Sequence, residues 1–359
     1  MLDERKTTND GAEFFAAANS GNGFVSFYEK IFNNKNIERR YLIKGGPGTG
    51  KSTFMRKVAD ALSSRGVRVD RYRCSSDPAS LDGIVIDGRI AIIDSTSPHA
   101  VEPDIAGARD VLINLGAFWS VDGLSNSYER ISELSAQKKR AYSLAYRFLC
   151  AAMQSDIASR ELLYPYLDKK RLKKIAKHQV RSIGSDGAYE CHVGLSSAIG
   201  MSGRFSLDSY AKIAKRVVYI EDHYGIGSLA LAEICELALQ NQNKISVSYE
   251  PLTPDCLNAV YFENSGVAFL LCKPREKKAV SLRRALDITS LSKKEKNSLK
   301  ARSRNAKKLA EALVIAATDE LFAAGNAHFE LEEIYKSNMD FNALELFTSQ
   351  FVEEIVRAC

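Results

Sequence analysis

The sequence lacks any run of about 18 uninterrupted apolar residues, the length that a membrane-spanning helix needs. Its best candidate, residues 309–324, contains three carboxylates. The first six residues, MLDERK, carry charges of both signs in place of an apolar core, so we expect no secretory signal. We therefore expect a soluble, cytoplasmic protein with no membrane partner.

Cysteine, proline and glycine show no special pattern either. The seven cysteines are scattered without a CxxC spacing, and an odd number without a secretory signal argues against a disulfide framework. Their spacings fit no zinc site, so we expect mostly buried or inert thiols. Eight prolines and 22 glycines in 359 residues exclude a collagen-like chain. The composition, 45% hydrophobic and 26% charged, is globular, and the length predicts roughly two domains.

One motif carries chemistry. Residues 45–52 read GGPGTGKS, a complete G-x-x-x-x-G-K-[ST] motif between a β-prone run and a helical pattern. Backbone N–H groups of such a loop surround phosphates, Lys51 can reach the β- and γ-phosphates in catalysis, and the Ser52 hydroxyl can bind Mg²⁺. The alternative is a glycine-rich turn before a surface helix. The residues predicted to contact ATP are Gly45, Gly46, Pro47, Gly48, Thr49, Gly50, Lys51, Ser52 and Thr53.

A second pattern supports the first. Residues 90–94, IAIID, form an apolar run that ends in a carboxylate, which is typical of a strand buried in a parallel sheet. After a P-loop, this is a Walker B pattern, in which Asp94 holds Mg²⁺ opposite Ser52. Residues 67–72 fit a strand between the motifs. We predict an α/β fold of the P-loop NTPase type, with a parallel sheet and the order strand, P-loop, helix, strand, helix, strand.

The sequence leaves the catalytic base open. Many ATPases have a glutamate directly after the Walker B aspartate, where this chain has Ser95. The candidates are Asp77 after the second strand, and His99 with Glu102 and Asp104 beyond the third. A proline follows Asp77, so this residue also fits a helix N-cap. A structural role for His99 is an equal alternative.

These residues resemble a bacterial family of tandem P-loop ATP-binding proteins. The shared pattern spans nearly the whole chain, and the resemblance implies ATP binding and two P-loop folds per chain, without supplying the reaction. Its motifs are residues 44–53, 74–83 and 94–99, and near the C-terminus His328, Glu332, Tyr335 and residues 339–341.

The sequence also contains a faint internal repeat. Gly225 and Gly227 lie 177 positions after Gly48 and Gly50, and the flanking residues 217–229 match a strand, loop and helix. Further matches follow in the same order, at residues 245–249, 257–260 and 267–271.

Departures from the motif decide the function predicted for the second repeat. Ser228 replaces the P-loop lysine and Leu229 replaces the Mg²⁺ hydroxyl. Glu221 and Asp222 place negative charge where phosphates would lie and would repel a triphosphate. We interpret this half as a pseudo-NTPase repeat, with an unrelated α/β domain as the alternative.

Helical sequence follows each core. Residues 128–154 and 161–180 predict two helices with a break near Ser159, and residues 293–324 and 329–357 predict a second pair. The GSDG at residues 184–187 is the best boundary signal. We therefore predict a P-loop domain with a helical hairpin at residues 1–185. A degenerate repeat with a helical C-terminus would occupy residues 186–359.

The net charge of +6 is concentrated in one basic block, residues 273–308, with 14 Lys or Arg against three Asp or Glu. The block fits solvated helix faces, a surface for a polyanion or protein partner, or the source of an arginine that reaches ATP across an interface, such as Arg302 or Arg304. It contains no aromatic residue, which argues against the stacking that single-stranded nucleic acids use.

Three functions remain open. The leading hypothesis is a Mg²⁺-dependent ATP-binding protein, a slow ATPase that acts as a conformational switch. The alternatives are a small-molecule or nucleotide kinase, and a non-catalytic nucleotide-dependent scaffold or polyanion binder. Ser95 in place of glutamate favours a kinase or switch, whereas the lack of a recognisable acceptor-binding arginine motif favours an ATPase over a kinase.

Overall fold

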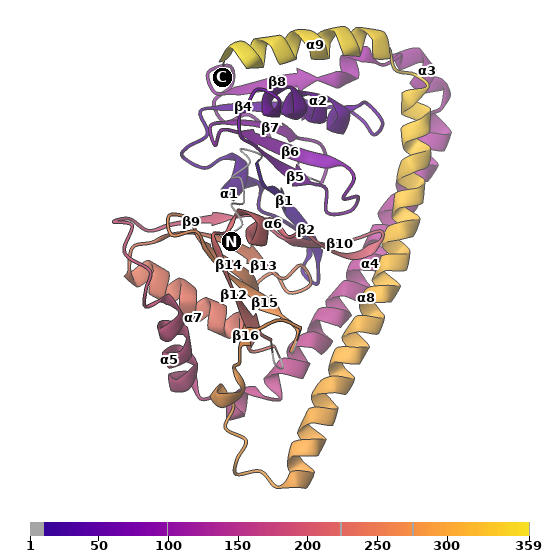
Figure 1. Cartoon of the computed structure of the whole chain (residues 1–359). Coiled ribbons are helices and arrows are strands. Elements are labelled where there is room, and N and C mark those ends of the chain that lie inside the picture. Colours follow the sequence, from indigo (N-terminus) through magenta and orange to yellow (C-terminus); the bar gives the residue numbers. More distant parts are fainter. Residues whose placement is uncertain (1–10, 99, 223–224, 275, 359) are drawn as a thin grey trace. The chain divides into compact units, whose positions relative to one another are not determined.

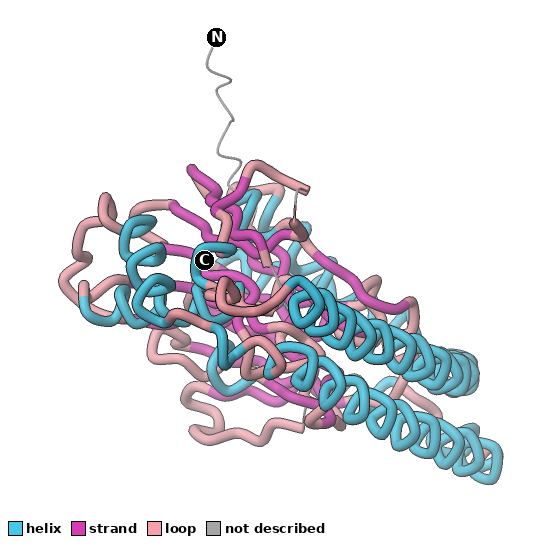
Figure 2. The backbone as a smooth tube through the Cα atoms, turned by 90° about the horizontal axis from the view of Figure 1, so that it is seen from below, coloured by secondary structure: helices cyan, strands magenta, loops and turns pink. Residues whose placement is uncertain are grey.

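The computed structural model describes residues 11–98, 100–222, 225–274 and 276–358, and the chain divides into two compact units. Unit 1 comprises Met1–Ala16, Ser26–Ala141 and Phe322–Cys359, and unit 2 comprises Ala17–Val25 and Tyr142–Leu321. Each unit combines a six-stranded sheet with helices. Figure 2 draws the helices of the chain in cyan and its strands in magenta. The predicted α/β class is confirmed.

The sheet of unit 1 is mixed rather than parallel. β6 is antiparallel to both of its neighbours, whereas the other strand pairs are parallel. The predicted parallel sheet is wrong at this strand, because the segment expected to form a helix forms β6 and turns back at Asp87 and Gly88, both with positive φ. The strand order is β1 (Glu13–Phe15), β5 (Val69–Arg73), β6 (Leu81–Ile86), β7 (Ile90–Asp94), β4 (Arg39–Lys44), β8 (Asp110–Asn114).

The sheet of unit 2 has the same plan. Its antiparallel strand is β14, which occupies the place of β6, and this agreement supports the predicted internal repeat. The order is β16 (Ala279–Val280), β12 (Arg216–Glu221), β15 (Val267–Cys272), β14 (Leu257–Phe262), β13 (Lys244–Tyr249), β9 (Glu190–Val193). Two hairpins, β2 (Ala17–Ser20) with β3 (Gly23–Ser26) and β10 (Ser197–Gly200) with β11 (Gly203–Ser206), are also present.

The helices of unit 1 cover the strand that precedes the glycine-rich motif. α2 (Lys51–Ser63) buries Phe54, Val58 and Leu62 at a helical spacing, and Phe54 stacks on Phe347 of α9 (Phe341–Ala358). The other helices are α1 (Tyr28–Phe32), η1 (Leu115–Phe118), α3 (Val121–Asn126), the first part of α4 (Tyr128–Glu161) and the last part of α8 (Lys293–Lys336).

The helices of unit 2 repeat this arrangement. α7 (Gly227–Gln240) follows β12 as α2 follows β4, and α5 (Lys169–Val180) packs on α7 (Figure 1). The shorter helices are α6 (Ser209–Ile213), η2 (Tyr164–Tyr166) and η3 (Arg283–Ala285).

The helical segments are exchanged between the repeats. α9 follows the second core in sequence but packs on α2 of unit 1, whereas α5 follows the first core but packs in unit 2. The matching bridges are Trp119 with Met339 in unit 1 and Leu286 with Leu167 in unit 2. The exchange is possible because α4 and α8 are long, with 34 and 44 residues, and each continues from one unit into the other.

The compact units therefore differ from the contiguous halves 1–185 and 186–359. The GSDG segment is not a boundary, because the side chain of Asn243 donates to the Gly184 carbonyl (2.6 Å) within unit 2. The first helix continues past the expected break at Ser159 to Glu161, and the last break falls between α8 and α9, at residues 337–340.

Two expectations about composition can be checked on the described residues. No helix among them is long and apolar enough to span a membrane. Their six cysteines are free, and Cys150 and Cys191 are exposed while the other four are half-buried. That most of the thiols are buried or inert stays a prediction in its second part, because the structure does not test reactivity.

Candidate functional site

The glycine-rich motif forms a loop between a strand and a helix, as predicted. β4 ends at Lys44, the glycine loop (residues 45–50) follows, and α2 begins at Lys51. Gly48 and Gly50 have φ angles of 69° and 81°, a left-handed conformation that glycine adopts without steric cost. The first turn of α2 has no acidic residue and no side-chain cap. Its N–H groups are thus available to an anion.

The last turns of α8 lie against the glycine loop. A β-carbon on Gly46 would lie 2.7 Å from Cε1 of Tyr335, and one on Gly48 would lie 2.5 Å from the backbone oxygen of Glu332. Both glycines are therefore needed for packing, and Gly48 is needed for the loop conformation as well.

Lys51 and Asp94 come together, as the two motifs predict. Lys51 Nζ donates to the carbonyls of Gly45 (3.2 Å) and Gly46 (2.8 Å) and lies 3.7 Å from Asp94 Oδ2. The parallel register pairs Ile43 with Asp94, so β7 ends beside the start of the loop. The other oxygen of Asp94 accepts hydrogen bonds from Thr96.

Ser52 and Asp94 offer the hard oxygen ligands that Mg²⁺ prefers. Ser52 Oγ accepts hydrogen bonds from the backbone N–H of Leu81 (3.0 Å), the first residue of β6, and from Arg56 (3.4 Å) of α2. No cluster of three or more His, Cys, Asp or Glu side chains within the described ranges could hold a metal ion. A magnesium ion at Ser52 and Asp94 would therefore need phosphate oxygens and water to complete its shell.

Sequence reasoning missed Asp82. The antiparallel register pairs Gly83 with Ile93 and therefore sets Asp82 directly across from Asp94. Side chains in such positions are close neighbours on one face of a sheet. Burial, and next the negative charge of Asp94, raises the pKa of Asp82 to about 8. The available signal was the Asp87–Gly88 dipeptide, which predicts the hairpin that makes this pair.

The predicted base candidates have different surroundings. Asp77 accepts hydrogen bonds from the backbone of Ala79 (3.1 Å) and from Ser80 Oγ (2.7 Å) in the turn before β6. No helix follows it, so the N-cap interpretation is wrong. His99 lies outside the described residues. Two further candidates form ion pairs, Glu102 with Lys44 (2.7 Å) and Asp104 with Arg40 (2.9 Å).

A second lysine lies beside the glycine loop. Lys138 Nζ of α4 is 3.3 Å from Nδ1 of His328, and Nε2 of His328 is 3.5 Å from Glu332, whose backbone covers Gly48. Burial, and next the positive charge of Lys51, lowers the pKa of Lys138. Two neighbouring cations that repel each other form a favourable environment for an anion.

In unit 2 the chain itself caps the matching helix; residues 223–224, in the segment before it, lie outside the described residues. Asp222 Oδ1 accepts a hydrogen bond from the N–H of Gly227, the first residue of α7 (2.8 Å). A β-carbon on Gly225 would lie 2.3 Å from Cγ of Arg160, whose guanidinium donates to Thr253 (2.9 Å). A carboxylate therefore occupies the helix N-terminus, and an arginine side chain packs on Gly225.

Unit 1 thus combines an uncapped helix N-terminus, two lysines, and two carboxyl groups at neighbouring strand ends. This arrangement can bind a polyanion such as a triphosphate and can hold a divalent cation beside it. No known protein family, curated protein or solved structure matches the chain. Its function is therefore inferred from the geometry of these residues.

Proposed function

We propose that the protein binds Mg²⁺–ATP at unit 1 and hydrolyses it slowly to drive a conformational change, while unit 2 binds no nucleotide. The observation that carries the proposal is that Lys51, the first residue of an uncapped helix, lies 3.7 Å from Asp94 at the end of the neighbouring strand, with Ser52 next to it in the helix. The resemblance to tandem P-loop ATP-binding proteins supports the same function. The broken motif of the second repeat and its own Asp222 support the assignment of unit 2.

Each residue has a physical role in this proposal. The N–H groups of the glycine loop and of α2 bind the phosphates, and Lys51 exchanges the carbonyls of Gly45 and Gly46 for phosphate oxygens. Ser52 and Asp94 hold Mg²⁺, which when bound neutralises phosphate charge. Ser95 bonds to the Val101 backbone and cannot take the place of a catalytic glutamate, so we expect hydrolysis to be slow.

The basic block stays a predicted partner surface. Arg302 and Arg304 lie on the part of α8 that belongs to unit 2, and Arg304 contacts its own helix at the Lys300 carbonyl (3.3 Å). No contact of these arginines points to a polyanion, a protein partner or a nucleotide, so binding of ATP at unit 1 remains the proposal with the best support.

Calorimetric titration of Mg²⁺–ATP into the full chain tests the proposal. We expect one site per chain and a loss of affinity on the order of a hundredfold or more in Lys51→Ala, because a charge-assisted phosphate contact is removed. The matched control Ser228→Ala, at the equivalent position of unit 2, should bind as the wild type does. Equal effects of the two substitutions, or no binding by the wild type, would overturn the proposal.

The products distinguish hydrolysis from phosphoryl transfer. Release of ADP and phosphate in buffer alone would support the ATPase. Formation of ADP that depends on an added acceptor would instead identify a kinase, and tight binding without any turnover would identify a nucleotide-dependent scaffold.

A further inference from the structure

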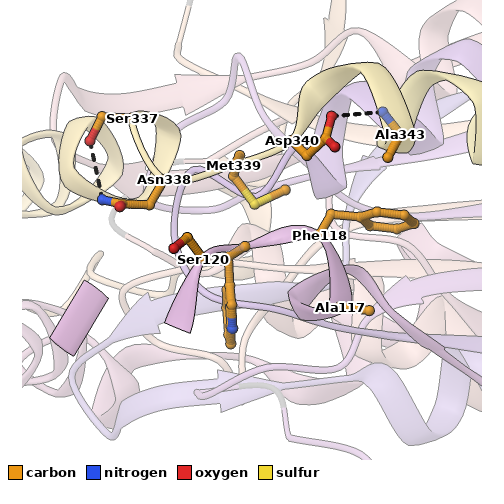
Figure 3. Close-up of a pocket in the computed structure, with 9 residues that line it drawn as sticks. Ala117, Phe118, Ser120, Ser337, Asn338, Met339, Asp340 and Ala343 are labelled. Atoms are coloured by element: carbon orange, nitrogen blue, oxygen red, sulfur yellow. Dashed lines mark hydrogen bonds between the residues drawn. The ribbon is translucent and has the colours of Figure 1, made fainter. Parts of the chain in front are cut away.

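Unit 1 contains an open hollow of about 510 Å³, lined by residues that follow β8 and residues between α8 and α9 (Figure 3). Two backbone hydrogen bonds join these walls, from Ser120 N to Asn338 O and from Asp340 N to Phe118 O, both 2.8 Å. The lining residues are Ala117, Phe118, Trp119, Ser120, Ser337, Asn338, Met339, Asp340 and Ala343.

The sheet brings this hollow close to the glycine loop. β8 runs parallel to β4 and pairs Asn114 with Lys44, so the two segments leave the same edge of the sheet. The ring of Trp119 lies 5.7 Å, centroid to centroid, from the ring of Tyr335. Tyr335 in turn covers Gly46 of the glycine loop. A single aromatic ring therefore separates the Trp119 side chain from the proposed phosphate site.

The lining has the chemistry that a purine base requires. Trp119, Phe118 and Met339 offer apolar surface, and stacking on an aromatic side chain stabilises a bound flat base. The polar side chains of the lining are Ser120, Ser337, Asn338 and Asp340. The amide N–H₂ of Asn338 already donates to the Ile334 carbonyl (2.8 Å) and to Ser337 (3.3 Å). Asp340 uses one oxygen to accept the N–H of Ala343 (2.9 Å), and a carboxylate has further acceptor positions for the N–H groups of a base edge.

The aromatic side chain is specific to unit 1. Trp119 pairs with Met339, whereas the same bridge in unit 2 is made by two leucines, Leu286 and Leu167. Packing at this position therefore does not demand tryptophan. The tryptophan occurs in the unit that has the loop lysine and is absent from the unit whose matching helix is capped by its own carboxylate.

We infer that this hollow is the binding site for the purine base of the nucleotide whose phosphates bind at the glycine loop, with Trp119 as the stacking partner. The inference rests on the proposed function and adds the position of the base. The triphosphate would lie along the glycine loop and the base beyond Tyr335, in the open hollow that the Trp119 and Met339 segments line.

Trp119 is the only tryptophan of the chain, so its fluorescence reports on this site directly. We would titrate the full chain with Mg²⁺–ATP, Mg²⁺–GTP and inorganic triphosphate, and measure binding by calorimetry in parallel. We expect one of the purine nucleotides to change the emission of Trp119, whereas triphosphate binds without this change. The comparison of ATP with GTP identifies which purine the site prefers.

Substitution supplies the second measurement. Trp119→Leu, which introduces the side chain found in unit 2, should lower nucleotide affinity roughly tenfold or more and leave triphosphate affinity unchanged. Trp119→Phe, which keeps an aromatic face, should retain most of the affinity. Nucleotide binding with unchanged emission and with unchanged affinity in Trp119→Leu would overturn the inference and leave the proposed function intact. So would an equal loss of nucleotide and triphosphate binding. Failure of the wild type to bind either ligand would instead overturn the proposed function.

Discussion

The helices that follow β4 and β12 begin at the same place in the fold but differ in charge: α2 begins with a lysine, whereas a carboxylate caps α7. In unit 1 the loop leads into α2 through Lys51, and no acidic residue lies in the first helical turn. In unit 2 the helix begins with Gly227 and Ser228, and Asp222 caps its first N–H group. The N-terminus of α2 is therefore open to an anion from solution, whereas the N-terminus of α7 already binds the carboxylate of Asp222.

The glycines at matching positions of the two loops share a backbone conformation, whereas the side chains that follow them differ. Gly48 and Gly225 keep nearly the same φ, 69° and 76°, although the lysine and the hydroxyl that follow Gly48 have no counterpart in unit 2. Both glycines also meet a neighbouring helix, at Glu332 and Arg160. A conserved turn of this kind therefore indicates the fold, and only the side chains around it indicate binding.

We expect the largest change in the free energy of unfolding when a buried ion pair of unit 1 is broken, a pair without a counterpart at the matching position of unit 2. Arg40 donates to both oxygens of Asp110 (2.7 and 2.8 Å), and both side chains are almost fully buried. Val217 of β12 stands at the position of Arg40. Asp110→Ala leaves the buried guanidinium without its main partner and should lower the free energy of unfolding by about 3–5 kcal/mol in urea denaturation.

The same pair predicts an acid dependence. Hydrogen bonds from Arg40 hold the pKa of Asp110 well below its usual range. A depressed pKa contributes stability that is present above the unfolded-state pKa, near 3.9, and is lost as the pH falls toward the folded-state pKa. Asp110→Ala should therefore weaken the fall in stability below about pH 4. The double variant Arg40→Met, Asp110→Leu should recover much of the free energy of unfolding. An unchanged free energy of unfolding in Asp110→Ala would show that the ion pair does not stabilise unit 1.

The next prediction tests whether Asp82 takes part in the proposed hydrolysis of ATP at unit 1. Asp82→Asn keeps the size of the side chain that faces Asp94 but removes a carboxyl group that can exchange a proton with water. We expect nucleotide binding to persist while kcat falls on the order of a hundredfold. Phosphate release at saturating ATP, with affinity measured separately, provides the readout.

Asp77→Asn is the matched control for Asp82→Asn. The carboxylate of Asp77 is already used in the turn before β6, where it bonds to Ala79 and Ser80. We expect lower thermal stability with turnover close to that of the wild type. If Asp77→Asn abolished turnover and Asp82→Asn did not, Asp77 would be the base.

Local signals in the sequence were sufficient for the glycine loop and for the meeting of Lys51 with Asp94. The loop is a contiguous motif, and parallel strands bring their carboxyl ends to one edge of the sheet. Asp82 could not be found in this way, because its position beside Asp94 arises from the antiparallel pairing of β6 with β7. A strict alternation of strands and helices predicts a helix where β6 instead forms a hairpin with β7.

The exchange of α5 and α9 was also beyond local patterns. The sequence predicts helices in both places, since apolar residues recur at helical spacing. It does not specify whether Phe347 and Phe351 cover the helix of their own repeat or of the other. They pack on Phe54 of α2 because α8 carries the chain back into unit 1. The contiguous domain division therefore separated residues that pack together.

A smaller effect tests whether the loop of unit 2 keeps any capacity for phosphate. Asp222→Ala removes the hydrogen bond to Gly227 and should lower stability by about 1 kcal/mol, as loss of a helix cap does. Asp168→Ala removes a comparable cap, at the start of α5, and is the matched control. Both should bind one ATP per chain in calorimetry. A second site that arises in Asp222→Ala alone would show a latent phosphate loop and break the contrast between the units.

The smallest effect concerns the edge strands, where unit 1 has the pair Glu13–Arg73 and unit 2 has His192–Glu263 (2.7 Å). The hydrogen bond with Glu263 raises the pKa of His192. A raised pKa contributes stability that is fully present below the unfolded-state value, near 6.5, and is lost as the pH rises through the folded-state pKa. The pair is about one-third exposed, so we expect the free energy of unfolding to fall by less than about 1 kcal/mol between pH 6 and pH 9 in urea denaturation.

His192→Gln should abolish this part of the pH dependence. The exposed His178→Gln, on α5, should leave it unchanged, and an equal response of both variants would assign the effect to another group.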